Sequence, residues 1–194
     1  MGTIASIIIV PHFARQWQDR QKEREVKQQL VASMGAAVTE ALKTSQFINL
    51  DLFGQAAAPG QEGKVSQQVY NRVQIQWEIR SAKINSQLRA YFPSTDLGQS
   101  WHRYSEVVTK AYQLVARLHD DRSGHLRDIR KYLGSGGSAI KWDALKDDTP
   151  TSEYATAFQA EYGKLITVMF ARKDKIIQDV LDANAAGFDT SLWP

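Results

Sequence analysis

The chain has 194 residues, of which 43% are hydrophobic and 23% are charged, and its formal net charge is +3 at pH 7. This composition is typical of a folded globular protein rather than a disordered one, and the length suits a single domain. The absence of cysteine excludes disulfides, iron–sulfur clusters, thiolate zinc sites and a cysteine nucleophile. Lys and Arg are dispersed among Asp and Glu, so no basic stripe of the kind that binds nucleic acid is present, and no nucleic-acid partner is expected.

The chain begins with an apolar run at residues 4–10, which is followed by Pro11, Phe13 and Trp17 and then by mixed charge. A secretory signal peptide needs a basic segment before the apolar run and a small-residue cleavage site after it, and this segment has neither. The run is shorter than the roughly 20 apolar residues of a membrane-spanning helix. Gly2 matches the myristoylation pattern M-G-x-x-x-S, but this short pattern often occurs by accident.

Two interpretations of the N-terminal segment remain. In the first, the run belongs to a membrane-associated helix, and Trp17 lies at the membrane–water interface. Residues 15–27 contain five Lys or Arg and three Asp or Glu, and this excess of basic residues would place the flank on the cytoplasmic side. In the second, the run packs on the helical body or on another copy of the chain. Both interpretations assign the contact to the same side chains: Ile4, Ile7, Ile8, Ile9, Val10, Phe13 and Trp17. We therefore expect residues 1–14 to form an attachment segment and residues 15–194 to form one helical domain.

Helical periodicity dominates the rest of the chain. Apolar residues recur at i,i+3 and i,i+4 spacing over residues 13–53, 65–92, 101–124 and 151–187, which predicts four long amphipathic helices. Within the first of them, residues 19–25 (DRQKERE) are polar on every side. This stretch is expected to be solvated or to project away from the core.

Breaks rich in glycine and proline separate the predicted helices. They lie at residues 54–64, at 93–98 and over the longest irregular stretch, 133–153, while residues 123–133 suit a short helix of their own. No strand-like alternation stands out, and four amphipathic helices joined by loops bury their apolar stripes most simply against one another. The sequence therefore predicts an all-α protein, an antiparallel four-helix bundle with a long, protruding N-terminal helix.

The densest group of candidate metal ligands lies in the stretch LVARLHDDRSGHLRD at residues 114–128. It contains His119, Asp120, Asp121, His125 and Asp128. No histidine in the chain has a carboxylate three residues before it, so the Glu-x-x-His pairs of di-iron bundles are missing, and the zinc-protease motif HExxH is also absent.

The stretch ARLHDD resembles the apolar-then-His-Asp motif of HD-domain phosphohydrolases, an all-helical, metal-dependent family. The resemblance covers about six residues and implies a metal site at His119 and Asp120, which His102 and Asp179 are nominated to complete. The Gly-Lys pair that often follows the motif in that family is missing here. The other interpretation is a polar helix end, where the helix dipole favours imidazole.

Two further patterns are assigned structural roles. The stretch LGSGGSA at residues 133–139 formally fits G-x-G-x-x-A, but a helical pattern precedes it instead of the strand that a dinucleotide site needs, so residues 134–138 are interpreted as a loop or an engineered linker. Five aromatic residues fall on helical stripes and are assigned to core packing, which the sequence cannot distinguish from binding of a small apolar ligand between them. They are Trp77, Trp101, Tyr112, Tyr154 and Tyr162.

The leading functional hypothesis is a non-enzymatic interaction or scaffold module. It would be cytoplasmic, at the inner face of a membrane, and would associate with that membrane or with other copies of itself through the N-terminal apolar segment. No cofactor, metal or specific small molecule is expected. The alternative hypothesis is a metal-dependent phosphohydrolase of the HD type that uses His119 and Asp120.

Overall fold

The computed structural model describes the backbone of residues 3–54, 67–116, 122–134 and 152–184, and the side chains of residues 17–46, 71–115, 124–134 and 156–184. Over these residues the protein is all-helical, as predicted from the sequence. The helices are α1 (Thr3–Gly54), α2 (Gln67–Tyr91), α3 (Leu97–Ala116), α4 (Arg122–Leu133) and α5 (Ser152–Asp182).

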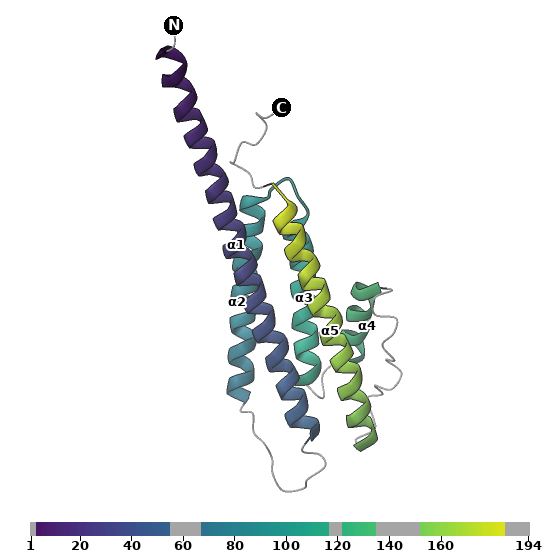
Figure 1. Ribbon diagram of the computed structural model, residues 1–194. Coiled ribbons are helices and arrows are strands. Elements are labelled where there is room, and N and C mark those ends of the chain that lie inside the picture. The colour runs from purple at the N-terminus through teal and green to yellow at the C-terminus, as the bar shows by residue number, and fades with distance from the viewer. Residues whose placement is uncertain (1–2, 55–66, 117–121, 135–151, 185–194) are drawn as a thin grey trace.

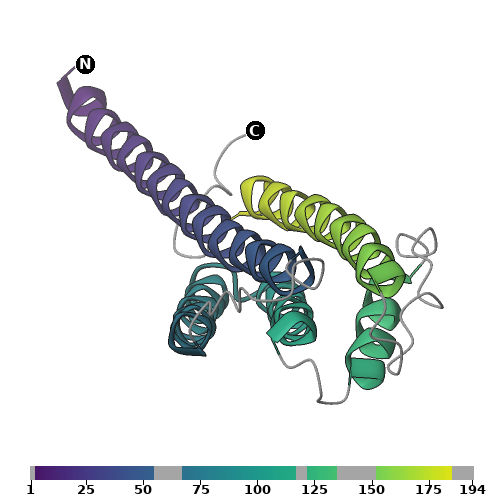
Figure 2. The same ribbon diagram turned by 90° about the horizontal axis from the view of Figure 1, so that it is seen from below.

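The four longer helices alternate in direction along the chain, since α1 and α3 run downward in Figure 1 whereas α2 and α5 run upward. Helix α1 contacts α2, α3 and α5, and α3 contacts α2, α4 and α5. Viewed from below, α1 and α5 form one layer that lies over a second layer of α2, α3 and α4 (Figure 2). The first and last helices of the chain are therefore neighbours.

Helix α1 has 52 residues and is about 78 Å long at a rise of 1.5 Å per residue. Its N-terminal part extends well beyond the ends of the other helices (Figure 1). The predicted start of this helix near Phe13 is wrong, because α1 begins at Thr3 and passes through Pro11 without a break. A proline removes one backbone N–H donor, and the helical hydrogen bonds on either side of it can persist. The boundary predicted between residues 14 and 15 therefore lies within one continuous helix.

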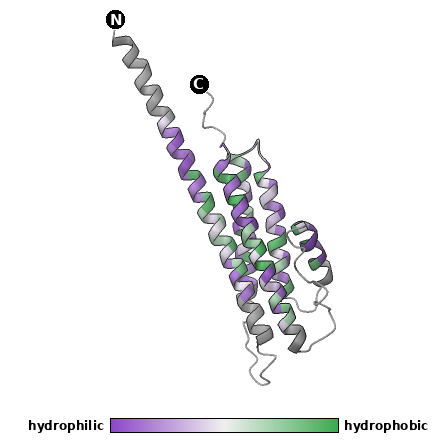
Figure 3. Cartoon of the chain, turned by 45° about the vertical axis from the view of Figure 1, so that its right-hand side comes forward, coloured by the Kyte–Doolittle hydropathy of each residue, from purple (hydrophilic) through white to green (hydrophobic). Residues whose placement is uncertain are grey.

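The hydrophobic core follows the apolar stripes predicted for α1, α2, α3 and α5. On α1 it begins at Leu30 and continues at every fourth residue through Met34, Val38 and Leu42, all of which are buried. Figure 3 shows the change along α1 from a hydrophilic stretch to residues of mixed hydropathy beside the other helices. Burial of these stripes is the main source of stability for such helices.

Helix α4 confirms the short helix predicted over residues 123–133, whereas the predicted end of the third helix is wrong. The third helix was expected to reach about Gly124, but α3 ends at Ala116, and Gly124 lies buried inside the separate helix α4. The reason is a short apolar stripe of its own, formed by Leu126, Ile129 and Leu133, which is buried in the common core and allows α4 to pack against α3. The helix ends at Leu133, and the next residue, Gly134, has a φ of 54°, in the left-handed region that glycine adopts without strain.

Candidate functional site

The residues predicted to contact a membrane or a partner all lie on α1. The side chains of Ile4, Ile7, Ile8, Ile9, Val10 and Phe13 are outside the described residues, although their backbone is helical. The side chain of Trp17 is described, and 63% of its surface is exposed. Among the described residues, no helix combines the length and the apolar character that crossing a membrane requires.

A cleft of about 490 Å³ lies between α1 and the C-terminal end of α5, and its lining on α1 begins at Arg20, one turn after Trp17. Its lining residues, together with Trp17, are called the collar here. They are Arg20, Glu23, Arg24, Lys27 and Gln28 from α1 and Leu181 and Asn184 from the end of α5.

A hydrogen bond joins the two sides of the collar, and an ion pair on its α1 side accompanies this bond. The Nζ atom of Lys27 donates a hydrogen bond to the backbone carbonyl of Leu181 at 3.0 Å, and it lies 3.0 Å from Oε1 of Glu23. Leu181 is in the last turn of α5, where carbonyl groups have no partner within the helix and the helix dipole attracts a cation. The position of Lys27 thus satisfies an acceptor that the helix itself leaves open.

The prediction for the polar stretch of α1 is confirmed for residues 19–22, 24 and 25, which are not buried, and is wrong at one residue. Residues 19–25 were expected to be solvated or to project from the core, but Glu23 is buried, and only 11% of its side-chain surface and 14% of that of Lys27 are exposed. Glu23 lies on the side of α1 that lines the cleft toward α5, where it pairs with Lys27. Burial of a charge is tolerated where an opposite charge and hydrogen bonds compensate its lost hydration.

The outer face of the collar combines apolar and basic groups. Trp17, Arg20, Arg24 and Gln28 follow one another at i,i+3 and i,i+4 spacing, so they lie along one face of α1. At the opposite wall Leu181 exposes 43% of its surface. An exposed indole beside guanidinium groups suits a surface that is apolar in one part and anionic in another.

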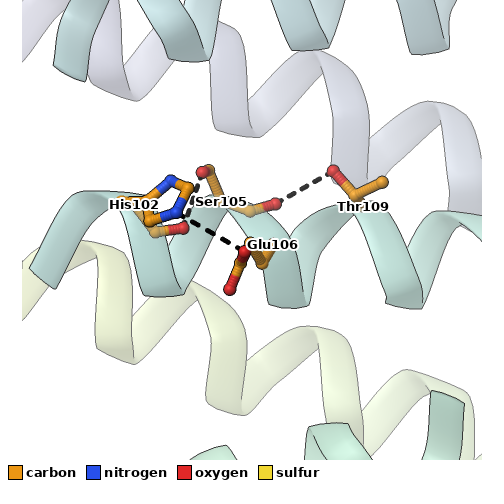
Figure 4. A network of polar contacts seen from close by, with 4 residues as sticks. All are labelled: His102, Ser105, Glu106 and Thr109. Carbon is orange, nitrogen blue, oxygen red and sulfur yellow. Dashed lines mark hydrogen bonds and ion pairs between the residues drawn. The ribbon is translucent and has the colours of Figure 1, made fainter. Parts of the chain in front are cut away.

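The nominated phosphohydrolase site is brought together only in part. His119 and Asp120 lie outside the described residues. His102 is on the exposed face of α3, where its Nε2 lies 3.5 Å from Oε1 of Glu106 (Figure 4). The nearby hydroxyl of Ser105 donates to the backbone carbonyl of His102 at 2.8 Å and not to its ring, so this histidine does not activate the serine as a nucleophile.

The other candidate ligands have different partners or places. Asp128 accepts a hydrogen bond from Lys110, and this bond and the lysine charge hold the pKa of Asp128 below its ordinary value. Asp179 lines a separate cleft between α3, α4 and α5. Within the described ranges, no three His, Cys, Asp or Glu side chains gather closely enough to hold a metal ion.

The assignment of the aromatic residues to the core is confirmed where their side chains are described. Trp77, Trp101, Tyr112 and Tyr162 are buried, and Tyr154 lies outside the described side chains. Their polar atoms bond to the protein itself, since Trp101 Nε1 donates to the carbonyl of Ser81 at 2.9 Å and the hydroxyl of Tyr162 donates to the carbonyl of Ala111 at 2.9 Å.

Sequence reasoning singled out Trp17 and its basic flank but did not predict that α5 forms the other side of the collar. Leu181 and Lys27 are 154 residues apart in the chain, and no local pattern links them. The sequence contains one indication for Leu181, which is that it directly follows Val180 on a helix. Val180 is buried in the core, so the side chain of Leu181 points in a different direction.

In comparisons with known proteins, no family model, curated protein or solved structure matches the chain.

Proposed function

We propose that the chain is a non-enzymatic interaction module that attaches to the cytoplasmic face of a membrane through the N-terminal part of α1. The observation that carries this proposal is the continuity of α1 from the apolar run at residues 4–10, past the exposed Trp17, into the helical body. Because the helix is continuous, an anchor at its N-terminal end would also fix where the helical body lies relative to the membrane. The apolar run would act as the anchor, and the collar would lie at the boundary between lipid and water.

The finer architecture that we propose for the body is an antiparallel four-helix bundle of α1, α2, α3 and α5, with α4 packed on α3. The alternating directions of these four helices (Figure 1) and their mutual contacts support it. In this arrangement the C-terminal end of α5 lies beside the collar, and α1 serves as the spacer between the anchor and the bundle.

The partner that the collar fits best is an anionic bilayer surface. Tryptophan is enriched at membrane–water interfaces because its ring is apolar and its N–H is polar. Arg20 and Arg24 lie one and two turns after Trp17 on the same face of α1, and each basic group near an anionic surface contributes about 1 kcal/mol of attraction. An apolar anchor combined with a basic flank supplies the two signals that stable peripheral attachment needs.

Vesicle flotation with the full chain tests this proposal. We expect the chain to float with vesicles of phosphatidylcholine and phosphatidylserine, and less with phosphatidylcholine alone. Trp17→Ala is expected to lower the partition coefficient by about tenfold, corresponding to about 1.4 kcal/mol of lost apolar burial. Ile8→Asp in the apolar run is expected to abolish flotation.

Matched variants on α2 serve as controls. Ile79→Ala removes a side chain that is 62% exposed, similar to Trp17, but far from the N-terminal end of α1. Lys83→Gln removes an exposed cation in the same way that Arg20→Gln and Arg24→Gln do at the collar. Failure of the unaltered chain to float would contradict membrane attachment. Concentration-dependent self-association that Ile8→Asp abolishes would then indicate that the run contacts a second copy instead.

A further inference from the structure

A second cleft, of about 220 Å³, lies where α3, α4 and α5 meet. Three cationic side chains line it, Arg103 from α3 and Arg172 and Lys175 from α5, with Asp179 as the carboxylate. Ser100 and Tyr132 add hydroxyl groups. We call this the basic cleft. On α5, residues 172, 175 and 179 share one face by their i,i+3 and i,i+4 spacing, whereas the collar uses Leu181 on another face.

The cations of the basic cleft are not neutralised by neighbouring carboxylates. Within the described part of the chain, Arg103, Arg172 and Lys175 form no ion pair, while six pairs join other residues. Three cations and one carboxylate leave a local charge of +2. A cleft that keeps these three cations from α3 and α5 close together raises the local concentration of anions.

A neighbouring carbonyl positions one donor of the cleft, Arg172, and Tyr132 supplies another. Arg172 donates from Nη2 to the carbonyl of Leu133 at the end of α4, at 3.3 Å, which holds its guanidinium group at the junction of the helices. A guanidinium group has five N–H donors, so others remain for a ligand. Tyr132 is half-buried, and burial raises the pKa of its phenol despite the opposing effect of Arg172 and Arg103. The phenol therefore keeps its proton and can donate a hydrogen bond.

From this geometry we propose that the basic cleft binds the phosphate monoester group of a small ligand. A phosphoryl group carries about −1.5 to −2 charge at pH 7 and three acceptor oxygens, which complements the charge of the cleft and its guanidinium, ammonium and hydroxyl donors. The cleft is smaller than the roughly 300–1,000 Å³ of sites for drug-sized ligands, so it suits the anionic group and little more. This inference does not depend on the membrane attachment proposed above.

The site can be tested by calorimetric titration of the full chain with inorganic phosphate, with chloride used to keep the ionic strength constant. We expect saturable binding that Arg103→Gln and Lys175→Gln each weaken by about tenfold, as loss of a charge-assisted hydrogen bond would. Asp179→Asn removes the opposing carboxylate and is expected to tighten binding several-fold. A gain of affinity cannot result from partial unfolding, so this variant tests the site even if the others are less stable.

Variants outside the cleft provide the matched controls. Arg130→Gln on α4 and Lys83→Gln on α2 remove exposed cations that do not line the cleft and should bind phosphate as the unaltered chain does. Equal weakening by these controls would mean that only the overall charge attracts the anion, and this would overturn the proposal. The proposal would also be overturned if the unaltered chain neither binds inorganic phosphate saturably in this titration nor floats with vesicles of phosphatidylcholine and phosphatidic acid.

A second arm distinguishes a soluble phosphate monoester from a lipid headgroup with the same chemistry. Vesicles of phosphatidylcholine with phosphatidic acid present the monoester on a membrane. Flotation with these vesicles that Arg103→Gln abolishes, without binding of free phosphate, would support the site and assign the headgroup as its ligand. If flotation is lost in Trp17→Ala but kept in Arg103→Gln, and free phosphate does not bind, the collar accounts for the binding and the basic cleft is excluded.

Discussion

Lys27 on α1 and Leu181 on α5 are joined by a hydrogen bond of 3.0 Å between residues 154 positions apart. This contact ties the hydrophilic stretch of α1 to the end of the last helix. It also places the collar at the boundary between the part of α1 that packs on other helices and the part that extends beyond them (Figure 1). The hydrophilic stretch of α1 is therefore connected to the body both through the helix and through this contact.

The first prediction concerns this contact. Lys27→Met keeps most of the aliphatic chain but removes the donor to Leu181 and the cation beside Glu23. We expect the free energy of unfolding to fall by about 1–3 kcal/mol, the usual cost of losing a hydrogen bond to a charged group. Urea denaturation at pH 7 measures it, with Lys43→Met, at an exposed position of α1, as the control. Since the two side chains interact, the loss in Lys27→Met with Glu23→Gln should be smaller than the sum of the single losses.

The second prediction contrasts two tryptophans. Trp101 is fully buried, whereas Trp17 is 63% exposed. Trp101→Ala is expected to lower the free energy of unfolding by about 3–5 kcal/mol because it leaves a cavity in the core. Trp17→Ala is expected to change it by no more than about 0.5 kcal/mol. Thermal and urea denaturation of the two variants measure both values. A similar large loss for Trp17→Ala would mean that this residue serves the fold and not an external contact.

The third prediction concerns alkaline pH. Tyr104 is fully buried and donates to the carbonyl of Met169 at 3.0 Å, and burial raises the pKa of its phenol far above the ordinary value. In the unfolded chain the phenol ionises near pH 10, so above that pH the native state binds more protons than the unfolded state does. This contribution to stability is complete below about pH 10 and falls by about 1.4 kcal/mol per pH unit above it.

Tyr104→Phe removes this contribution. The variant is expected to be about 1 kcal/mol less stable at pH 7, where only the hydrogen bond is lost, and to lose less stability than the unaltered chain above pH 10. Urea denaturation between pH 7 and pH 11 compares the two slopes. Tyr132→Phe provides a second comparison, because burial raises the pKa of Tyr132 as well. Parallel curves for Tyr104→Phe and the unaltered chain would contradict the prediction.

The fourth prediction compares two glycines. A Cβ atom at Gly98 would lie 2.6 Å from Cγ of Arg89, whereas one at Gly35 would meet nothing within 4 Å. Gly98→Ala is expected to cost about 1–2 kcal/mol, since the arginine side chain must move from a close contact between α2 and α3. Gly35→Ala, in the interior of α1, is expected to add about 0.5–1 kcal/mol because alanine restricts the unfolded chain and favours the helix. Opposite shifts in melting temperature would confirm both.

The elements that periodicity predicts well are those whose burial is set within one helix. Leu30, Met34, Val38 and Leu42 are spaced by four residues and are all buried. Periodicity also indicated the short helix α4, but it placed the end of the third helix too far along the chain, near Gly124 instead of Ala116. The prediction that α1 would begin after Pro11 was wrong because proline interrupts one hydrogen bond without ending the helix.

By itself, the sequence determined the all-helical class and most of the core stripes, since both depend on a repeat of three or four residues along one helix. Only the tertiary structure decided that Lys27 meets Leu181 and that Arg103 and Arg172 line one cleft. These pairs come from different helices, and their meeting depends on how whole helices pack. Helical periodicity shows which face of a helix is buried, but not which helix covers it.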